Sequence, residues 1–533
     1  MATLLMGGET EYAIGAARNG ADIQPELLRS LVNITCYDFP RSSDSGSGRF
    51  QRNGGLLYLD CGLHMEWATP ECTSPHDVAR YLRAGDRMIE RLARKFAAES
   101  LPAEVFCSRS NVDYLAGTSW ASHENYLHYS NPYRLPTQFI PFLASRLVMC
   151  GAGGWDFASP GLRFALSPRA CFITEQTADE SQHVRPLFHT RDEELSNTGS
   201  HRMHVACSET LCSDLGTVLR FGSTALVLAI VDAGALPAAH MQLKRPLRAL
   251  RAFAADPQCR LQVPLVDGRP VTAIDIQRHY LHAVEDRLGA SCLPEWAESV
   301  CALWRKTLDD LESAPEKLTG SLDWAIKQRL FADFLRRHDI DWSALPAMNA
   351  ILMRLSRALG PGGGRVALEA LISEHTDVAR IVDSHLGRSS RSRVTREQLM
   401  TLLRVRPQLF ELDMRFGELG ERGIFNTLDR AGVLNHHVDG VGDIASAVDT
   451  PPRNTRAAVR GRVLQRFAED HTHYRAEWMR IIDFNLNRVL DLRDPFEAAE
   501  RWLDGTNAIR SLDRMAPDGR LTDPLEPYRR ITW

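Results

Sequence analysis

Acidic side chains at alternate positions of two short, strand-like runs constrain this chain more than any other feature. In the run Tyr58-Leu-Asp-Cys-Gly-Leu-His-Met-Glu66, positions 58, 60, 64 and 66 are all even. Side chains alternate across a β-strand, so one strand would place Tyr58, Asp60, His64 and Glu66 on a single face. Near the N-terminus, Glu9 and Glu11 are likewise two residues apart.

Two strands that present spaced carboxylates to one surface suit a hard divalent cation, which takes oxygen ligands. The alternative is that these are ordinary outward carboxylates of half-exposed antiparallel strands. The spacing alone leaves both interpretations open.

Length and composition set the outer bounds. A chain of 533 residues normally divides into two or more domains, or one large domain with an appendage. Its 44% hydrophobic and 24% charged residues are typical of a globular protein. A net charge of −4 gives no reason to expect nucleic acid as the main partner.

Cysteine usage indicates a reducing compartment. The 11 cysteines are scattered and form no C-x-x-C pair or regular framework. The N-terminal residues lack a basic region and are interrupted by Glu9 and Glu11, so no signal peptide is expected. The best apolar run, 224–231, is too short to span a bilayer. We expect a cytoplasmic protein with no membrane partner.

The pattern along the chain predicts strands first and helices later. Strands are expected at Leu56–Cys61 and Val105–Cys107, and an exposed loop at Arg41–Arg49. Apolar periodicity predicts five helices: Pro75–Ala98, Leu219–Ala233, Ile274–Arg287, Leu293–Glu312 and Trp324–Arg337.

The sequence also suggests a division into domains. Gly360–Gly364 and Arg388–Arg393 separate helical patterns within about 345–408, which we interpret as an inserted helical subdomain. A boundary near 440 leaves residues 1–440 as the catalytic domain and 441–533 as a small C-terminal domain of strand, helix and loop.

Eight motifs, in order along the chain, give the sequence its resemblance to a known family. They are Met6–Tyr12, Arg52–Cys72, Asn111–Asp113, Ser122–Leu127, Thr190–Glu193, Arg202–Val205, Asp323–Lys327 and Thr450–Gly461. Together they resemble the Pup ligase and Pup deamidase (depupylase) family. The resemblance implies an α+β, glutamine synthetase-like fold, with a curved antiparallel sheet backed by helices.

The resemblance also implies a chemistry. ATP and magnesium would activate the γ-carboxylate of a C-terminal glutamate on a small protein modifier as an acyl phosphate. A lysine amine of a target protein would then attack and form an isopeptide bond. The implied partners are a Pup-like modifier ending in Glu or Gln, lysine-bearing targets and a bacterial proteasome-type system.

Roles for individual residues follow from the matched motifs. Asp60 matches the catalytic acid/base position, where a carboxylate can take a proton from the incoming lysine ammonium. The implied metal ligands, the last three by analogy with the glutamine synthetase-like fold, are Glu9, Tyr58, Glu66, Glu11, His123 and His204. Isolated histidines are more often structural, so His123 and His204 stand out only through their motifs.

Nucleotide contacts are implied at five positions. Thr69 and Trp478 match nucleotide-binding residues, although Trp478 alone would be taken for core. Arg191, Arg202 and Arg456 are candidate phosphate partners, because a guanidinium fork fits phosphate oxygens.

One position departs from the family pattern. The family's usual arginine, two residues before the tyrosine, is Leu56 here. In the relatives that arginine contacts ATP, so nucleotide affinity or geometry is in question. Arg52 is a candidate for compensation.

Three functions remain open: ligase, amidase and non-catalytic nucleotide-binding adaptor. The amidases carry a long insertion after the first strand, whereas only Gly15–Gln51 separates the first two motifs here. Cys150–Gly153, Asp323–Lys327 and Arg493–Phe496 are also more ligase-like. In contrast, Asn111–Asp113 and Ser122–Glu124 are closer to the amidase. We favour the ligase.

Overall fold

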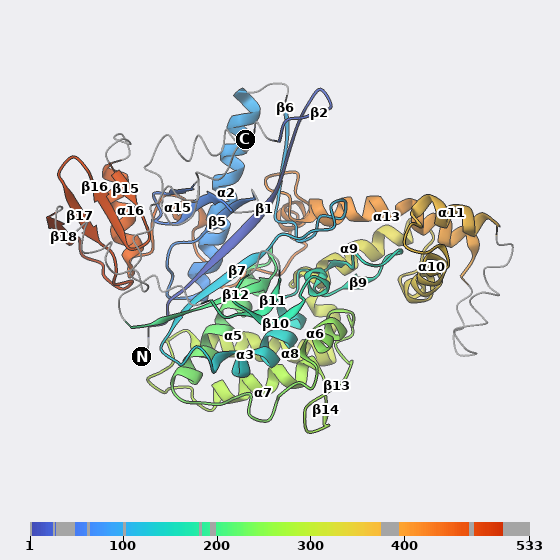
Figure 1. Ribbon diagram of the computed structural model, residues 1–533, viewed down its shortest axis with the longest axis horizontal. Helices are drawn as coiled ribbons and strands as arrows, with labels where there is room; N and C mark the ends of the chain where they lie inside the picture. The colour runs from blue at the N-terminus through green and yellow to red at the C-terminus, as the bar shows by residue number, and fades with distance from the viewer. Residues whose placement is uncertain are drawn as a thin grey trace.

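Ten strands form one sheet that contains the alternating carboxylates (Figure 1). The computed structural model describes residues 3–24, 27, 48–60, 64–99, 103–180, 184–191, 199–374, 394–467 and 474–504. The strand order is β10-β11-β12-β7-β1-β5-β4-β3, and β2 and β6 also pair with β1. Their bounds are β1 Met6–Arg18, β2 Ala21–Asp22, β3 Gly48–Phe50, β4 Leu56–Leu59, β5 Met65–Ala68, β6 Ala103–Ser108, β7 Ser122–His128, β10 Glu175–Ala178, β11 Pro186–His189 and β12 His201–Ser208.

Pairing in this sheet is antiparallel except at one edge. β10 runs parallel to β11, so the predicted antiparallel sheet is a mixed one. The long strand β1 is central, because its first half pairs with β7 on one side and β5 on the other, and its second half pairs with β6. The predicted strand Val105–Cys107 is confirmed within β6.

The prediction of a single strand through Tyr58 and Glu66 is wrong, because the segment is a hairpin. β4 ends at Leu59 and β5 begins at Met65. Tyr58 lies directly opposite Glu66, and the Asp60 backbone N–H donates to the His64 carbonyl at 3.0 Å. Residues directly opposite one another in an antiparallel pair project to the same face. The four side chains therefore still share a face.

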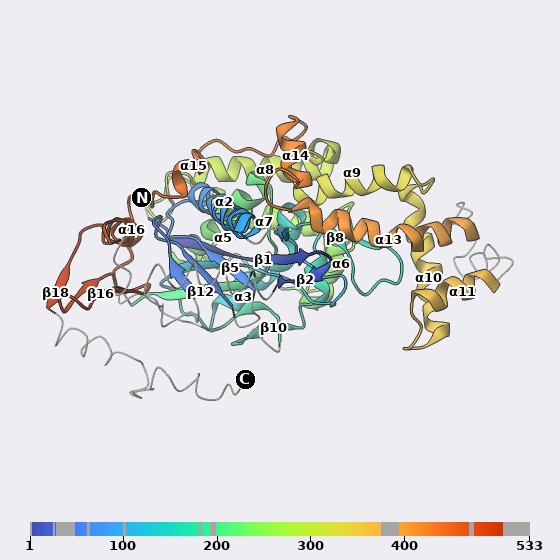
Figure 2. The same ribbon diagram turned by 90° about the horizontal axis from the view of Figure 1, so that it is seen from above.

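Helices cover the other face of the sheet. The Tyr12 hydroxyl donates to Asp86 in α2 (Pro75–Glu99) at 2.8 Å, and Trp67 Nε1 donates to the Tyr81 carbonyl at 2.9 Å. Gly8 lies against the helices so closely that a Cβ there would be 2.9 Å from the Phe221 ring in α5 (Asp214–Asp232). Figure 2 shows α2 lying along one side of β1. The alternate positions, with Glu9, Glu11 and Glu66, face away from these helices.

The predicted helices are confirmed with small shifts at their ends. Helix α2 spans Pro75–Glu99, and α5 begins five residues earlier than predicted. The helices of this part of the chain are α2 Pro75–Glu99, α3 Leu135–Ser145, α4 Leu147–Cys150, α5 Asp214–Asp232, α6 Pro246–Ala254, α7 Ala273–Glu285, α8 Ala297–Ser313 and α9 Asp323–Arg336. Two small two-stranded sheets lie among them: β8 Gly154–Trp155 with β9 Phe164–Ala165, and β13 Val263–Pro264 with β14 Pro270–Val271.

Helix α5 is long and apolar enough to cross a membrane by length and composition alone. However, 89% of its apolar window is buried inside the protein. Such burial is usual for the core helix of a globular fold, and α5 packs against α2, α8 and β7.

Helices of the 345–408 segment project from one end of the molecule (Figure 1). They are α10 Leu345–Leu359, α11 Arg365–Glu374 and α13 Arg396–Phe416. The Gly360–Gly364 joint lies between α10 and α11, as expected, whereas Arg388–Arg393 falls outside the described residues. So does most of the predicted loop Arg41–Arg49.

A four-stranded sheet lies at the opposite end of the molecule (Figure 1). The final part of the chain contains α14 Ile424–Arg430, α15 Ile444–Ala447, α16 Arg456–Arg466, β15 Tyr474–Ala476, β16 Arg480–Asp483, β17 Arg488–Asp491 and β18 Trp502–Asp504. Phe50, Leu56 and Ala68 share an apolar cluster with Val459 and Leu490. The C-terminal sheet is thereby attached to the end of the large sheet that carries Tyr58 and Glu66.

Candidate active site

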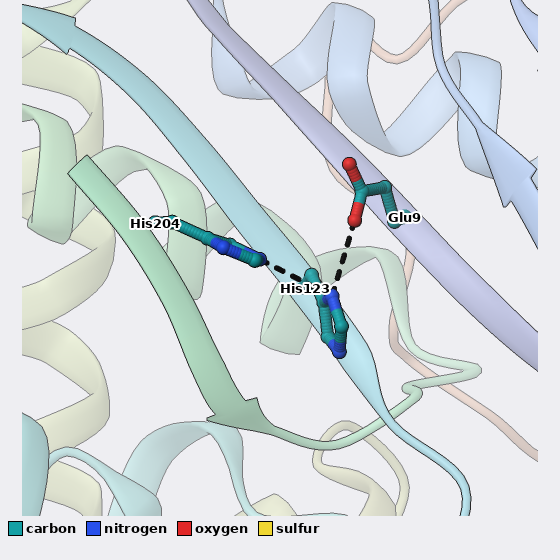
Figure 3. Close-up of side chains that lie close together, drawn as sticks. All are labelled: Glu9, His123 and His204. Carbon is teal, nitrogen blue, oxygen red and sulfur yellow. Dashed lines mark hydrogen bonds and ion pairs between the residues drawn. The ribbon is translucent and has the colours of Figure 1, made fainter. Parts of the chain in front are cut away.

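Glu9, His123 and His204 form a row across three neighbouring strands (Figure 3). Glu9 in β1 is directly opposite His123 in β7, and His204 in β12 is opposite Asn125 in β7. His123 Nδ1 lies 3.1 Å from Glu9 Oε2 and 3.2 Å from His204 Nε2. The strand register thus brings together three predicted metal ligands that are far apart in sequence.

Glu11, Glu66 and Tyr58 continue this row on the other side of β1. Glu11 is opposite Glu66 in β5, and Glu66 is opposite Tyr58 in β4. The Ala121 N–H donates to Glu11 Oε2 at 2.7 Å. All six predicted metal-site residues therefore lie on one face of five consecutive strands. We call these six residues the carboxylate face.

Asp60 lies at the rim of the carboxylate face, where the β4–β5 hairpin turns. The His64 backbone N–H donates to Asp60 Oδ1 at 2.6 Å, and His64 Nδ1 is 3.2 Å from Asp60 Oδ2. His64 Nδ1 is also 3.8 Å from Glu11 Oε2. His64 therefore holds the Asp60 carboxylate beside the carboxylate face.

Electrostatics on this face favour a bound cation. Burial raises the pKa of Glu66 well above its ordinary value, and the neighbouring Glu9 and Glu11 charges raise it further. Among the described residues Glu66 forms no ion pair, and its buried Oε1 has no hydrogen-bond partner. Burial opposes ionisation of Glu9 as well, but His123 and Arg202 lower the pKa of Glu9 overall. Clustered carboxylate oxygens of this kind fit magnesium.

The two histidines differ in charge preference. Burial lowers the pKa of His123, but the contact with Glu9 outweighs it and raises the pKa overall. Burial together with the positive charges of His123 and Arg202 lowers the pKa of His204 well below its ordinary value. His204 is therefore neutral near pH 7, which is the form in which an imidazole nitrogen can coordinate a metal.

A pocket opens beside Glu9, between the large sheet and the C-terminal part of the chain. Four of the five predicted nucleotide residues line it: Thr69, Arg202, Arg456 and Trp478. Arg191, the fifth, is exposed and does not line the pocket. Glu9 lines this pocket and also belongs to the carboxylate face, so the two are continuous.

Arg456 is held in this pocket by a carboxylate that the sequence did not reveal as a partner. Its Nε donates to Glu71 Oε1 at 2.6 Å, and Arg460 donates two hydrogen bonds to the same carboxylate at 2.8 and 2.9 Å. Arg460 also lies against the Trp478 ring, 5.0 Å from its centroid. Glu71 thus links strand residues near Thr69 to helix α16 and the C-terminal sheet.

Leu56 is buried in the apolar cluster beneath α16 and the C-terminal sheet. It is opposite Ala68 in β5 and Phe50 in β3. Neither Leu56 nor the exposed Arg52 lines the pocket. The position at which the resemblance implied an arginine is therefore apolar packing here, and Arg52 does not replace that arginine in this pocket.

Asn125 lies within the Ser122–Leu127 motif and is a site residue that sequence reasoning missed. Its Nδ2 donates to Glu9 Oε1 at 3.1 Å, and it lines the pocket. Its buried Oδ1 has no hydrogen-bond partner among the residues that the structure describes. The signal was the even spacing of Asn125 from His123, which puts both side chains on one face of β7.

Comparison with known proteins agrees with this arrangement. The family model described as Pup-ligase protein matches residues 4–357 and 365–482. The Pup–protein ligase of Acidimicrobium ferrooxidans is 30% identical over 518 residues, 95% of this chain and 98% of the relative. That of Actinosynnema mirum is 28% identical over 94% of this chain and 98% of the relative.

Solved structures show the same fold. The crystal structure of the complex between the ubiquitin-like protein Pup and its ligase PafA matches with a TM-score of 0.72 at 23% identity, covering 100% of this chain and 98% of that one. PafA in complex with ADP matches with a TM-score of 0.65 at 25% identity, covering 88% and 90%.

The family match also bears on the 345–408 segment. It stops at residue 357 and resumes at 365, so most of the segment predicted to be an insertion lies within the matched length. The motifs, the sheet that carries them and the match along most of the sequence agree, and the chain belongs to the Pup ligase family.

Proposed function

We propose that this protein is an ATP- and magnesium-dependent carboxylate–amine ligase of the cytoplasm. It joins the C-terminal glutamate of a small Pup-like modifier to a lysine amine on target proteins. Membership of the Pup ligase family supports the ligase direction over the amidase and over the non-catalytic adaptor.

One observation carries this proposal: Glu9 belongs to both the pocket and the carboxylate face. A nucleotide in the pocket directs its phosphates toward Glu9, while the base lies toward Trp478. Phosphoryl transfer needs cations and cationic side chains around the transferring group. Where the pocket meets the carboxylate face, the carboxylates would hold the cation, and Arg202 and Arg456 supply the cationic side chains.

Thr69, Arg202, Arg456 and Trp478 bind the nucleotide in this proposal. Arg202 lies near Glu9, whose pKa it lowers, and so faces the phosphate end of the pocket. Arg456 keeps its orientation through Glu71. Arg191 lies outside the pocket, and its phosphate contact remains a prediction from the motif alone.

Glu9, Glu11, Tyr58, Glu66, His123 and His204 are the residues that hold magnesium in this proposal. The buried, unpartnered Oε1 of Glu66 and the concentration of carboxylates support this assignment. Bound magnesium supplies positive charge that neutralises phosphate oxygens during transfer. The chain's residues fix where that charge lies.

Asp60 accepts the proton in the ligation step. The γ-carboxylate of the modifier takes the γ-phosphoryl group of ATP and releases ADP. A lysine ammonium gives one proton to the Asp60 carboxylate, and its freed amine attacks the acyl carbon. The amide bond forms as the bond to phosphate breaks, and inorganic phosphate leaves with the second proton of the amine. His64, 3.2 Å from Asp60 Oδ2, keeps the carboxylate at the rim where an acceptor lysine can enter.

The reaction direction can be tested directly. The protein is incubated with ATP, magnesium, a modifier ending in Gly-Gly-Glu and a lysine-bearing acceptor protein. We expect one ADP for each modifier added, with the matching mass gain on the acceptor. Cleavage of a preformed conjugate without matching ADP release would overturn the ligase proposal and favour the amidase. Nucleotide binding without turnover in either direction would favour the adaptor.

The division into a catalytic domain, residues 1–440, and a C-terminal domain, residues 441–533, also remains a proposal. The four-stranded sheet β15–β18 supports a separate C-terminal unit. The ion pairs of Glu71 with Arg456 and Arg460 then act as the connection between the two parts at the pocket.

A further inference from the structure

Two arginines lie together on the side of the carboxylate face away from the nucleotide pocket. Arg169 belongs to a short 3-10 helix, Pro168–Cys171, and Arg185 directly precedes β11. Arg169 Nη1 is 3.2 Å and Arg185 Nη1 is 2.9 Å from the same oxygen, Ser119 Oγ. The two guanidinium groups are therefore within roughly 6 Å of each other, a distance at which like charges repel.

Neither arginine guanidinium has a carboxylate partner within the described ranges. Arg169 is only 3% exposed, and its guanidinium also donates to the carbonyls of Trp120 and Ala206, while its backbone N–H donates to Glu209 Oε1 at 2.8 Å. Within the described part of the chain, its buried Nε has no hydrogen-bond partner. Arg185 is half-buried, and its guanidinium lies 5.5 Å from the centroid of the Phe172 ring. Burial lowers the pKa of Arg169, and the charges of Glu11 and Glu209 offset this only in part. Buried charges are normally paired, so two neighbouring arginines with this incomplete compensation indicate a site for an anion.

A short segment connects this pair to the proposed reaction centre. The Trp120 carbonyl accepts from Arg169 Nη1 at 2.6 Å, and the next N–H, that of Ala121, donates to Glu11 Oε2 at 2.7 Å. The Trp120 ring is 6.3 Å from the His64 ring, centroid to centroid. The arginine pair is thus adjacent to Glu11 and to the histidine that holds Asp60.

We propose that Arg169 and Arg185 form the subsite that binds the α-carboxylate of the modifier's C-terminal glutamate. This inference rests on the proposed function. A C-terminal glutamate carries a γ-carboxylate, which reacts, and a free α-carboxylate about 5 Å away by bond lengths. With the γ-carboxylate near Asp60, the α-carboxylate reaches toward the arginine pair. The planar guanidinium fork matches a carboxylate.

The position of the pair favours this anion over a nucleotide phosphate. The nucleotide pocket contains Glu9, Arg202 and Arg456, whereas neither Arg169 nor Arg185 lines it. Such a subsite selects a modifier whose glutamate is the last residue. It rejects an internal glutamate or one with a blocked C-terminus, because the two arginines would then remain without the anion.

The test compares two forms of one modifier, both ending in Gly-Gly-Glu and both with a free γ-carboxylate. One has a free α-carboxylate and the other an α-carboxamide. With the wild-type protein we expect the amide form to have a KM about 10- to 100-fold higher, the range for a lost hydrogen bond to a charged group. Arg185→Gln should raise the KM of the acid form by a similar factor and remove the difference between the two forms.

Three further measurements distinguish binding of the α-carboxylate from general effects of substitution and from phosphate binding. Arg185→Lys keeps the charge and should keep part of the discrimination. Arg269→Gln, an exposed arginine of a distant turn, should behave as wild type. The KM for ATP should stay within about twofold in Arg185→Gln; a parallel rise would assign Arg185 to phosphate and overturn the proposal.

The subsite proposal fails if wild type does not distinguish acid from amide, or if Arg185→Gln keeps the wild-type ratio. Binding calorimetry with the same two modifiers, in the absence of an acceptor, separates this failure from failure of the proposed function. A protein that binds the acid form better, loses that preference in Arg185→Gln and yet forms no isopeptide bond would keep the subsite and refute the ligase.

Discussion

Tyr58 and Glu66 face each other across a hairpin, and Glu66 in turn faces Glu11 across the next strand pair. This relationship places a buried carboxylate with no ion-pair partner, within the described ranges, between a phenol and a second carboxylate. Burial, and then the charges of Glu66 and Glu9, raise the pKa of Tyr58 well above its ordinary value. Carboxylates this close together repel one another without a cation and are stabilised by one. We therefore expect cation binding at this site to stabilise the folded protein.

Replacing Glu66 should therefore weaken the dependence of the melting temperature on magnesium. In Glu66→Gln the repulsion with Glu9 and Glu11 is relieved, so we expect a melting temperature without magnesium at or above that of wild type. The increase that magnesium produces in wild type should fall by at least about half, because one ligand is lost. Thermal unfolding with and without magnesium, with exposed Glu104→Gln as the control, measures both effects. A normal magnesium-induced increase in Glu66→Gln would remove Glu66 from the metal site.

Asp60→Asn should separate binding from turnover. Asparagine keeps the shape and the hydrogen bond from the His64 N–H but cannot accept the lysine proton. We expect ATP affinity within about twofold of wild type and a ligation rate lower by about 10²–10⁴. Single-turnover ligation measures the ligation rate, and nucleotide titration measures the ATP affinity. Asp286→Asn, at an exposed position, is the control. Undiminished ligation by Asp60→Asn would rule out the proton-transfer role.

Much of the candidate site could be predicted from the sequence, although the predicted strand is in fact a hairpin. The alternation of side chains places the same residues on one face in both cases. The sequence suggested one strand through 58–66, whereas the chain turns between Leu59 and Met65. Tyr58 pairs with Glu66, and Asp60 lies opposite His64, so the register links even-numbered residues only with one another. A turn that shifted the register by one residue would have sent half of these side chains to the helix-covered face.

The remaining features depend on contacts between distant parts of the chain. Glu71 and Arg456 are 385 residues apart, and no local pattern marks them as partners. Arg456 was expected to contact phosphate, and the structure adds that Glu71 accepts a hydrogen bond from it at the pocket. The parallel edge β10–β11 was missed for a related reason, since strand direction is set by the connecting chain rather than by residue alternation. Helices with strong apolar stripes, such as α2, could be predicted without knowledge of such contacts.

The Glu71 cluster predicts a specific loss of stability in acid. Burial alone would raise the pKa of Glu71, but Arg460 and Arg456 lower it to about 2 from an ordinary 4.5. A lowered pKa in the folded state stabilises the fold above the ordinary value, and this contribution is lost as pH falls from about 4.5 toward 2. The shift corresponds to about 3 kcal/mol.

Urea unfolding at pH 6, 4 and 3 tests this contribution. Glu71→Gln should lower the urea midpoint at pH 6, because two buried arginines lose their counter-charge. The gap between wild type and Glu71→Gln should narrow as pH falls, while exposed Glu421→Gln should follow wild type at every pH. A gap that stays constant down to pH 3 would show that the charge of Glu71 contributes nothing to stability.

Trp478 should act on the nucleotide rather than on the modifier. Its ring packs edge-on against Phe50, with centroids 5.0 Å apart, and lies at the pocket beside Arg456. Stacking of a base on an aromatic ring is worth about 1–3 kcal/mol, so Trp478→Ala should raise the KM for ATP by about 5- to 150-fold. The KM for the modifier should change little, because the modifier reaches the site from the Asp60 side.

Trp502→Ala serves as the control. Trp502 also belongs to the C-terminal part of the chain, but its ring packs on Arg488. Equal effects of the two substitutions on the KM for ATP would mean that the C-terminal sheet acts only as a support and that Trp478 does not contact the base.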